Sequence, residues 1–78
     1  SPKYPLVLKQ NHKTTLLEVP GYKEVSHDIE GQLGDQGRIF VRYSGTEPLV
    51  RVLVEGTSEK KISQYAEQIS NFLQKNLS

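Results

Sequence analysis

The pattern of apolar and polar residues predicts β-strands in three short stretches of the chain. The first stretch covers residues 4–9, with Leu6 and Leu8 on one face. The other two, Arg38–Tyr43 and Leu49–Glu55, are rich in β-branched and aromatic residues. Because only a short polar segment separates them, they are predicted to form an antiparallel hairpin.

Two other stretches have helical spacing. The first spans residues 22–33, where Gly31 costs about 1 kcal/mol relative to Ala, and Gly34 supplies a stop signal. The second follows Ser58, a good N-cap. Its apolar residues recur three to four positions apart: Ile62, Tyr65, Ala66, Ile69, Phe72, Leu73 and Leu77. Between the elements, an apolar run at 16–19 ends at Pro20, and residues 34–37 are predicted to form a turn.

The order strand, helix, hairpin, helix predicts an α+β domain, with two helices packed on one face of a small, mostly antiparallel sheet. The 78 residues are expected to form one domain, 1–78, whose core is small because so short a chain buries only about 60% of its unfolded surface. With 35% hydrophobic and 24% charged residues, the composition is typical of a globular domain.

The charge and the amino-acid composition disfavour several classes of function. The net charge of +1 provides no global field that would favour nucleic acid or an anionic membrane as a partner. No segment approaches the roughly 20 apolar residues of a membrane span. The absence of cysteine excludes disulfides and thiolate zinc sites, and favours a cytoplasmic location. The absence of methionine fits either removal of the initiator residue or an excised fragment, and in the second case residue 1 is not the start of the gene.

The predicted hairpin contains an unfavourable pair. If opposed residue numbers sum to 93, one face is apolar, pairing Ile39 with Val54, Val41 with Val52 and Tyr43 with Val50. The other face pairs Arg38 with Glu55, Phe40 with Leu53 and Arg42 with Arg51. Like charges directly across a ladder destabilise it, by up to roughly 1 kcal/mol.

An anion between the two guanidiniums would remove this repulsion, because each can direct two donors onto phosphate or carboxylate oxygens. The adjacent Ser44, Gly45 and Thr46 supply two hydroxyls and a glycine able to adopt positive φ, so a backbone nest for an anion is expected. Such a site would hold a phosphate by about 4 kcal/mol, close to millimolar affinity. In the alternative interpretation, Glu47 or Glu55 neutralises the two solvated arginines.

Residues 37–56 read Gly-Arg-Ile-Phe-Val-Arg-Tyr-Ser-Gly-Thr-Glu-Pro-Leu-Val-Arg-Val-Leu-Val-Glu-Gly. This segment resembles the C-terminal signature of the phosphohexomutase superfamily, Arg-x-Ser-Gly-Thr-Glu-Pro-x-x-Arg. Residues 51–56, the terminal helix and residues 4–8 look most like the phosphoglucosamine mutase branch. Residues 9–12, Lys-Gln-Asn-His, replace the Asn-Val motif usual in that branch, so the resemblance points to a phosphate anchor more than to one sugar.

The resemblance implies a TBP-like C-terminal domain of a larger isomerase, an intramolecular phosphotransferase that interconverts hexose 6- and 1-phosphates, with glucosamine the expected sugar. It implies that Arg42, Ser44, Gly45, Thr46 and Arg51 bind the phosphate that is not being transferred. Glu47 is expected to orient the loop or an arginine rather than to bind substrate. The domain would then act as a lid, hinged before its first residue.

Two elements that the family's chemistry requires are missing from the chain. Neither the Ser-His-Asn segment that carries the family's phosphoserine nor the Asp-Gly-Asp-Gly-Asp loop that binds its Mg²⁺ occurs here. The fragment alone is therefore expected to be inactive, with no catalytic residue, metal ligand or cofactor of its own. The expected partners are the hexose phosphate substrate and the remaining domains of the enzyme, which would hold the Mg²⁺.

Other functions have weaker support in the sequence. An independent enzyme would need His12 or His27 to act with Ser44 or Asp28, and nothing spaces such groups together. Adjacent His27 and Asp28 would point about 100° apart on a helix, which is unfavourable for a metal. A stand-alone phosphate- or RNA-binding module could use aromatic residues for stacking. The candidates are Tyr4, Tyr22, Phe40 and Tyr43. A purely structural lid with a vestigial anion site is the last alternative.

Overall fold

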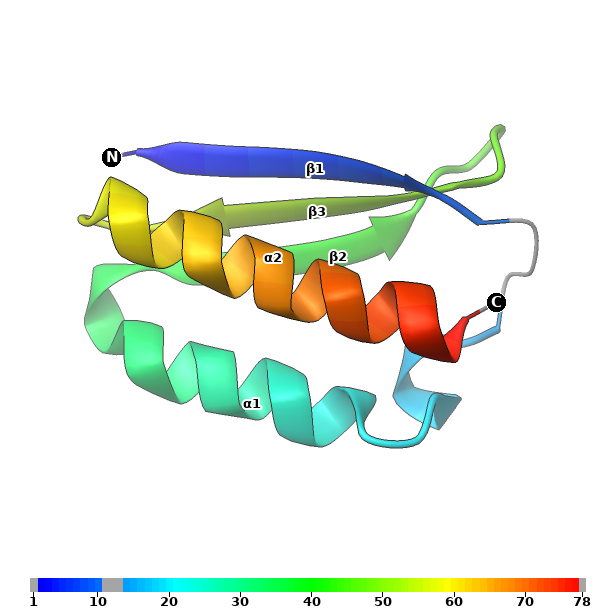
Figure 1. The fold of residues 1–78 in the computed structure, drawn as a ribbon, viewed down its shortest axis with the longest axis horizontal. Coiled ribbons are helices and arrows are strands. Elements are labelled where there is room, and N and C mark those ends of the chain that lie inside the picture. The colour runs from blue at the N-terminus through cyan, green and yellow to red at the C-terminus, as the bar shows by residue number, and fades with distance from the viewer. Residues whose placement is uncertain (1, 11–13, 78) are drawn as a thin grey trace.

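A computed structural model describes residues 2–10 and 14–77 of the chain, which form two layers (Figure 1). One layer is a sheet of three strands: β1 (Lys3–Lys9), β2 (Arg38–Tyr43) and β3 (Leu49–Glu55). The other consists of the helices α1 (Tyr22–Leu33) and α2 (Glu59–Asn76). Short 3-10 turns occupy Leu16–Glu18 and Gly34–Gln36. Neither described helix combines the length and apolar character needed to cross a membrane.

The sheet is antiparallel throughout, with the order β1-β3-β2, so β3 is the central strand. Its pairing with β2 runs from Arg38 opposite Glu55 to Tyr43 opposite Val50, which confirms the predicted register. On its other edge β3 pairs with β1, where Leu8 lies opposite Val50. Strand β3 therefore pairs both with the N-terminal strand β1 and with its hairpin partner β2.

Local sequence accounts for the helix boundaries. The Ser58 hydroxyl accepts a hydrogen bond from the Lys61 N–H at 3.3 Å, which confirms the predicted N-cap of α2. Helix α1 begins after Gly21 and ends before Gly34, and both glycines have positive φ, 87° and 55°. Left-handed backbone at these positions favours glycine and breaks the helical ladder.

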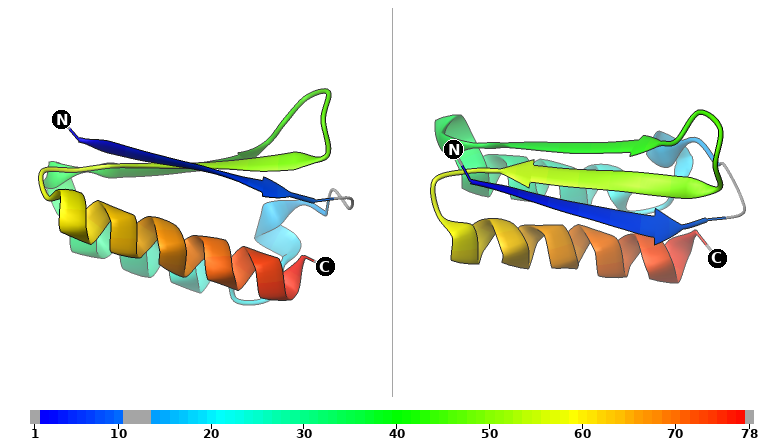
Figure 2. Two further views of the ribbon diagram at one scale, coloured as in Figure 1. Left: turned by 45° about the horizontal axis from the view of Figure 1, so that its top comes forward. Right: turned by 90° about the horizontal axis from the view of Figure 1, so that it is seen from above.

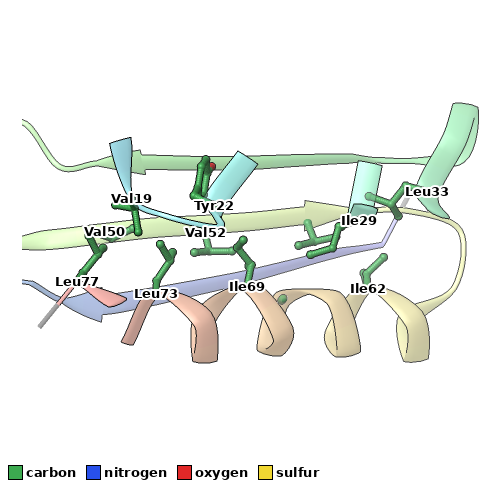
Figure 3. Close-up of a cluster of buried hydrophobic side chains, with 12 residues drawn as sticks. Val19, Tyr22, Ile29, Leu33, Val50, Val52, Ile62, Ile69, Leu73 and Leu77 are labelled. Carbon is green, nitrogen blue, oxygen red and sulfur yellow. The ribbon is translucent and has the colours of Figure 1, made fainter. Parts of the chain in front are cut away.

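Both helices cover the same face of the sheet (Figure 2). The inward-facing residues of β3 are fully buried at Val50, Val52 and Val54. They pack against Ile29 of α1 and against the apolar stripe of α2, as the close-up of the core shows (Figure 3). The opposite face of the sheet is left uncovered by the described parts of the chain.

The α+β class and the one-sided helical layer are confirmed. Three details differ from the prediction: β1 begins one residue earlier, at Lys3, the apolar run near residue 16 forms a 3-10 turn, and the turn after α1 is also 3-10. Strand β1 extends because its first residue still pairs with Glu55 at the end of β3. These differences leave the hairpin and its loop where the register predicted them.

Candidate functional site

The loop end of the hairpin carries the two opposed arginines. Arg42 of β2 lies directly opposite Arg51 of β3, and both side chains are exposed on the uncovered face of the sheet. On its other side Arg51 faces Val7 of β1. The ladder therefore places no carboxylate directly across from Arg51.

The next positions on this face also lack acidic residues. Arg51 is flanked along β3 by Leu49 and Leu53, and Lys9 lies opposite Leu49. Within residues 2–10 and 14–77, neither the Arg42 side chain nor the Arg51 side chain forms an ion pair or hydrogen bond, so the described residues do not support neutralisation by Glu47 or Glu55. Lys9, which sequence reasoning did not select, adds a third cation at this end of the sheet.

A shallow depression adjoins the arginine pair. It has a volume of about 480 Å³ and is lined by Phe40, Arg42, Arg51, Leu53 and Glu55. The arginines stand at the loop end, the two apolar residues form the middle, and Glu55 lies at the far end opposite Arg38. The volume is within the range of roughly 300–1,000 Å³ typical of small-molecule sites.

The loop between β2 and β3 is a serine turn. The Ser44 hydroxyl oxygen accepts hydrogen bonds from the N–H groups of Thr46, at 3.5 Å, and Glu47, at 3.3 Å. The Ser44 N–H in turn donates to the Leu49 carbonyl at 2.9 Å, which closes the loop. Serine favours this arrangement because its short side chain competes for nearby backbone donors.

The expected nest centred on Gly45 is wrong for this state of the domain. Positive φ occurs at Gly21 and Gly34 among the described glycines, and Gly45 does not share it. The physical reason is the serine turn, since Ser44 already engages the amides of Thr46 and Glu47 that a nest would direct at an anion. The side-chain donors at this end of the hairpin include the two guanidiniums and the Thr46 hydroxyl.

Gly45 is not required by its surroundings within the domain. A Cβ built on Gly45 would meet no described atom within 4 Å, and the backbone there is not left-handed. Glycine at such a position fits a site where a ligand approaches the backbone closely.

Two residues outside the predicted set hold the loop. The Gln10 N–H donates to the Pro48 carbonyl at 2.6 Å, and the Tyr43 hydroxyl donates to the Thr14 carbonyl. Burial raises the pKa of Tyr43 above its usual value near 10, so the phenol remains protonated and able to donate. Sequence reasoning missed Gln10 because the pairing of β1 with β3 was not predictable from the hairpin alone.

The alternative functions gain no support from the geometry. His27 and Asp28 are exposed on α1, where Asp28 accepts a hydrogen bond from Gln32, and His12 lies outside the described residues. In residues 2–10 and 14–77, no three His, Cys, Asp or Glu side chains gather as a metal site. Tyr22 and Tyr43 pack on the core whereas Phe40 lies on the uncovered face, so the aromatic residues form no common stacking surface.

Comparison with known proteins places this geometry in a family. Residues 7–72 match the sequence model of the phosphoglucomutase/phosphomannomutase C-terminal domain. The chain is 52% identical over 66 residues to a phosphoglucosamine mutase from Bdellovibrio bacteriovorus, covering 85% of this chain and 14% of that protein. It is 41% identical to a phosphoglucosamine mutase from Clostridioides difficile, covering 97% of this chain and 18% of that protein.

The fold agrees with a solved relative. A crystal structure of an N-acetylglucosamine-phosphate mutase, of the α-D-phosphohexomutase superfamily, aligns with a TM-score of 0.68 and 26% identity. The alignment covers 92% of this chain and 15% of that one. The chain therefore spans less than a fifth of the length of these relatives, and it belongs to the family of phosphoglucomutase/phosphomannomutase C-terminal domains.

Proposed function

We propose that this domain anchors the phosphate group of a hexose phosphate for a phosphoglucosamine mutase-like isomerase. The ligand set is Arg42, Ser44, Gly45, Thr46 and Arg51. The observation that carries the proposal is the pair of guanidiniums directly opposed in the ladder, for which the described residues supply no counter-ion.

The energetics favour an anion at this position. Two like charges across a ladder cost the hairpin up to roughly 1 kcal/mol. A phosphate between them would reverse the sign of the interaction, and each charge-assisted hydrogen bond contributes about 1.5–3 kcal/mol. Because the site is open to water, the total is expected to correspond to about millimolar affinity.

The loop would contribute a hydroxyl donor and a stretch of backbone that the ligand can approach closely. The Thr46 hydroxyl can donate to a phosphate oxygen, and Gly45 leaves the backbone accessible because no side chain covers it. The serine turn fixes the Ser44 oxygen beside both groups. Ser44 would bind a phosphate oxygen by donating its O–H, a role that accepting from the two amides does not use.

The substrate class follows from the chemistry and from the named relatives. A site with cations at one end and apolar Phe40 and Leu53 beside them recognises a phosphate and places few demands on the rest of the molecule. Such recognition suits a mutase whose sugar binds in either orientation. The relatives named as phosphoglucosamine mutases make an amino-sugar phosphate the proposed substrate.

The phosphoryl transfer itself is assigned to other domains of the enzyme. The Mg²⁺ that the family implies is assigned to those domains as well. Residues 1–78 would act as one unit, a lid that brings its phosphate anchor over a cleft formed by the other domains and excludes water from it.

Steady-state kinetics of the full-length enzyme test the proposal. Arg42→Ala and Arg51→Ala are expected to raise KM for glucosamine 6-phosphate by about 10- to 100-fold each, since one charged ligand is lost. Arg38→Ala removes a cation from the same strand and face, at the opposite end of β2, and is the matched control. Unchanged KM in the two variants, or an equal effect in the control, would count against the anchor.

A further inference from the structure

Three segments of the chain come together near the loop between β2 and β3, residues 44–48. The hairpin loop, the end of β1 and the end of α2 all lie at the same end of the molecule (Figure 1). Gln10, the residue after β1, donates its N–H to the Pro48 carbonyl at 2.6 Å. Its side-chain amide donates to the Leu77 carbonyl. One residue thus connects the exit of the loop to the end of the final helix.

The Leu77 carbonyl is a reasonable partner for the Gln10 side chain. The last four carbonyls of a helix have no acceptor role within the helical ladder and need donors from elsewhere. Leu77 follows the last residue of α2, and its side chain is buried in the core, so its backbone position is fixed. Gln10 is therefore held from two directions.

The entrance of the loop is fixed separately. Tyr43 is the last residue of β2, and its half-buried ring packs against the core on the helix side of the sheet. Its hydroxyl donates to the Thr14 carbonyl. Strand alternation then directs the preceding Arg42 to the opposite face, where Arg51 lies. Fixing the Tyr43 side chain therefore restricts the strand end from which Arg42 projects.

We propose that Gln10 and Tyr43 are positioning residues of the phosphate anchor, which hold the exit and the entrance of the loop before the ligand arrives. The inference rests on the proposed function. A ligand that binds to a prearranged loop loses less free energy to ordering than one that must first immobilise it. Neither residue needs to contact the phosphate for this effect.

A calorimetric titration of the chain with glucosamine 6-phosphate tests the proposal, together with amide hydrogen exchange at residues 44–47 and 49. Tyr43→Phe and Gln10→Ala each remove one hydrogen bond and are expected to weaken binding by about 3- to 10-fold. Exchange of the loop amides should accelerate in both variants, while exchange in the centre of β3 stays slow.

Tyr4→Phe is the matched control, because Tyr4 also lies on the inner face of the sheet but at the opposite end, across from Val54. Its affinity and loop exchange should equal those of the wild type. Wild-type affinity in Tyr43→Phe and Gln10→Ala would overturn the positioning role. If Arg42→Ala also left binding unchanged, or if the wild type did not bind, the proposed function would fail with it.

Discussion

Arg42 and Arg51 are the residues at which the stability of the hairpin and its proposed function oppose each other. Every other pair on this face of β2 and β3 is neutral or of opposite charge, namely Phe40 with Leu53 and Arg38 with Glu55. A pair that repels in the empty domain becomes favourable only when an anion lies between its members. The same local cost is typical of binding sites in otherwise consistent sequences.

At Gly45, one substitution should change stability and phosphate affinity in opposite directions. Gly45→Ala should stabilise the domain by about 0.4–1 kcal/mol, because the backbone is not left-handed and the new methyl meets no described atom. Phosphate affinity should nevertheless fall about tenfold, since the methyl obstructs approach to the backbone. Urea unfolding of the variant measures the change in stability, and a titration of the same sample with phosphate measures the change in affinity.

Gly34→Ala provides the contrast for this experiment. Gly34 has a φ of 55°, so its substitution should destabilise the domain, although a Cβ there also meets no described atom. It lies after α1 and should leave the affinity unchanged. Loss of stability in Gly45→Ala without loss of affinity would show that Gly45 serves the fold and not the ligand.

At the scale of elements, the hairpin and α2 were predictable because their determinants are local. The alternation in β2 and β3 fixed the register that opposes Arg42 and Arg51, and Ser58 with the apolar stripe fixed α2. The strand order was not predictable in the same way, because residues 10–48 separate β1 from its partner β3 in the sequence. The contact of Gln10 with Pro48 depends on that pairing, and the Gly45 conformation depends on hydrogen bonds of the Ser44 hydroxyl that no spacing reveals.

Two glycines test the packing between elements. A Cβ at Gly37, just before β2, would lie 2.1 Å from the Glu55 carbonyl oxygen and 3.0 Å from Gly56 Cα. Gly37→Ala should therefore lower the free energy of unfolding by about 1–3 kcal/mol. Gly31→Ala, inside α1 and free of contacts within 4 Å among described atoms, should raise it by up to about 1 kcal/mol. If chemical denaturation showed that both substitutions change the free energy of unfolding in the same direction, the close packing of Gly37 against the end of β3 would be contradicted.

At the scale of the whole molecule, one sheet face builds the core and the other presents the site. Both helices and the inward valines of β3 occupy the first face, so substitutions at Arg42, Arg51 or Thr46 should not disturb folding. This separation is what allows a small domain to carry an unfavourable charge pair. It also explains why the site could be proposed from the hairpin while its supporting contacts could not.

Folding stability should decline in alkaline solution because of Tyr22. Burial raises the pKa of Tyr22, and the negative charge of Glu30 raises it further. A raised pKa in the folded state contributes stability below the unfolded value near 10, and that contribution is lost as pH rises through the folded value. Tyr22→Phe should therefore lose less stability than the wild type between about pH 9 and pH 11. Equal losses in urea unfolding would contradict the assignment to Tyr22.

The most direct measurement is an amide chemical-shift titration of this chain with glucosamine 6-phosphate, with unphosphorylated glucosamine as the ligand control. A phosphate anchor should give saturable shifts between Arg42 and Arg51 at about millimolar concentration, seen with the phosphate and not with glucosamine. The double variant Arg42→Ala, Arg51→Ala should lose these shifts, and Arg38→Ala should keep them. Amides that remain unmoved up to about 50 mM ligand, or shifts that persist in the double variant, would contradict the phosphate anchor.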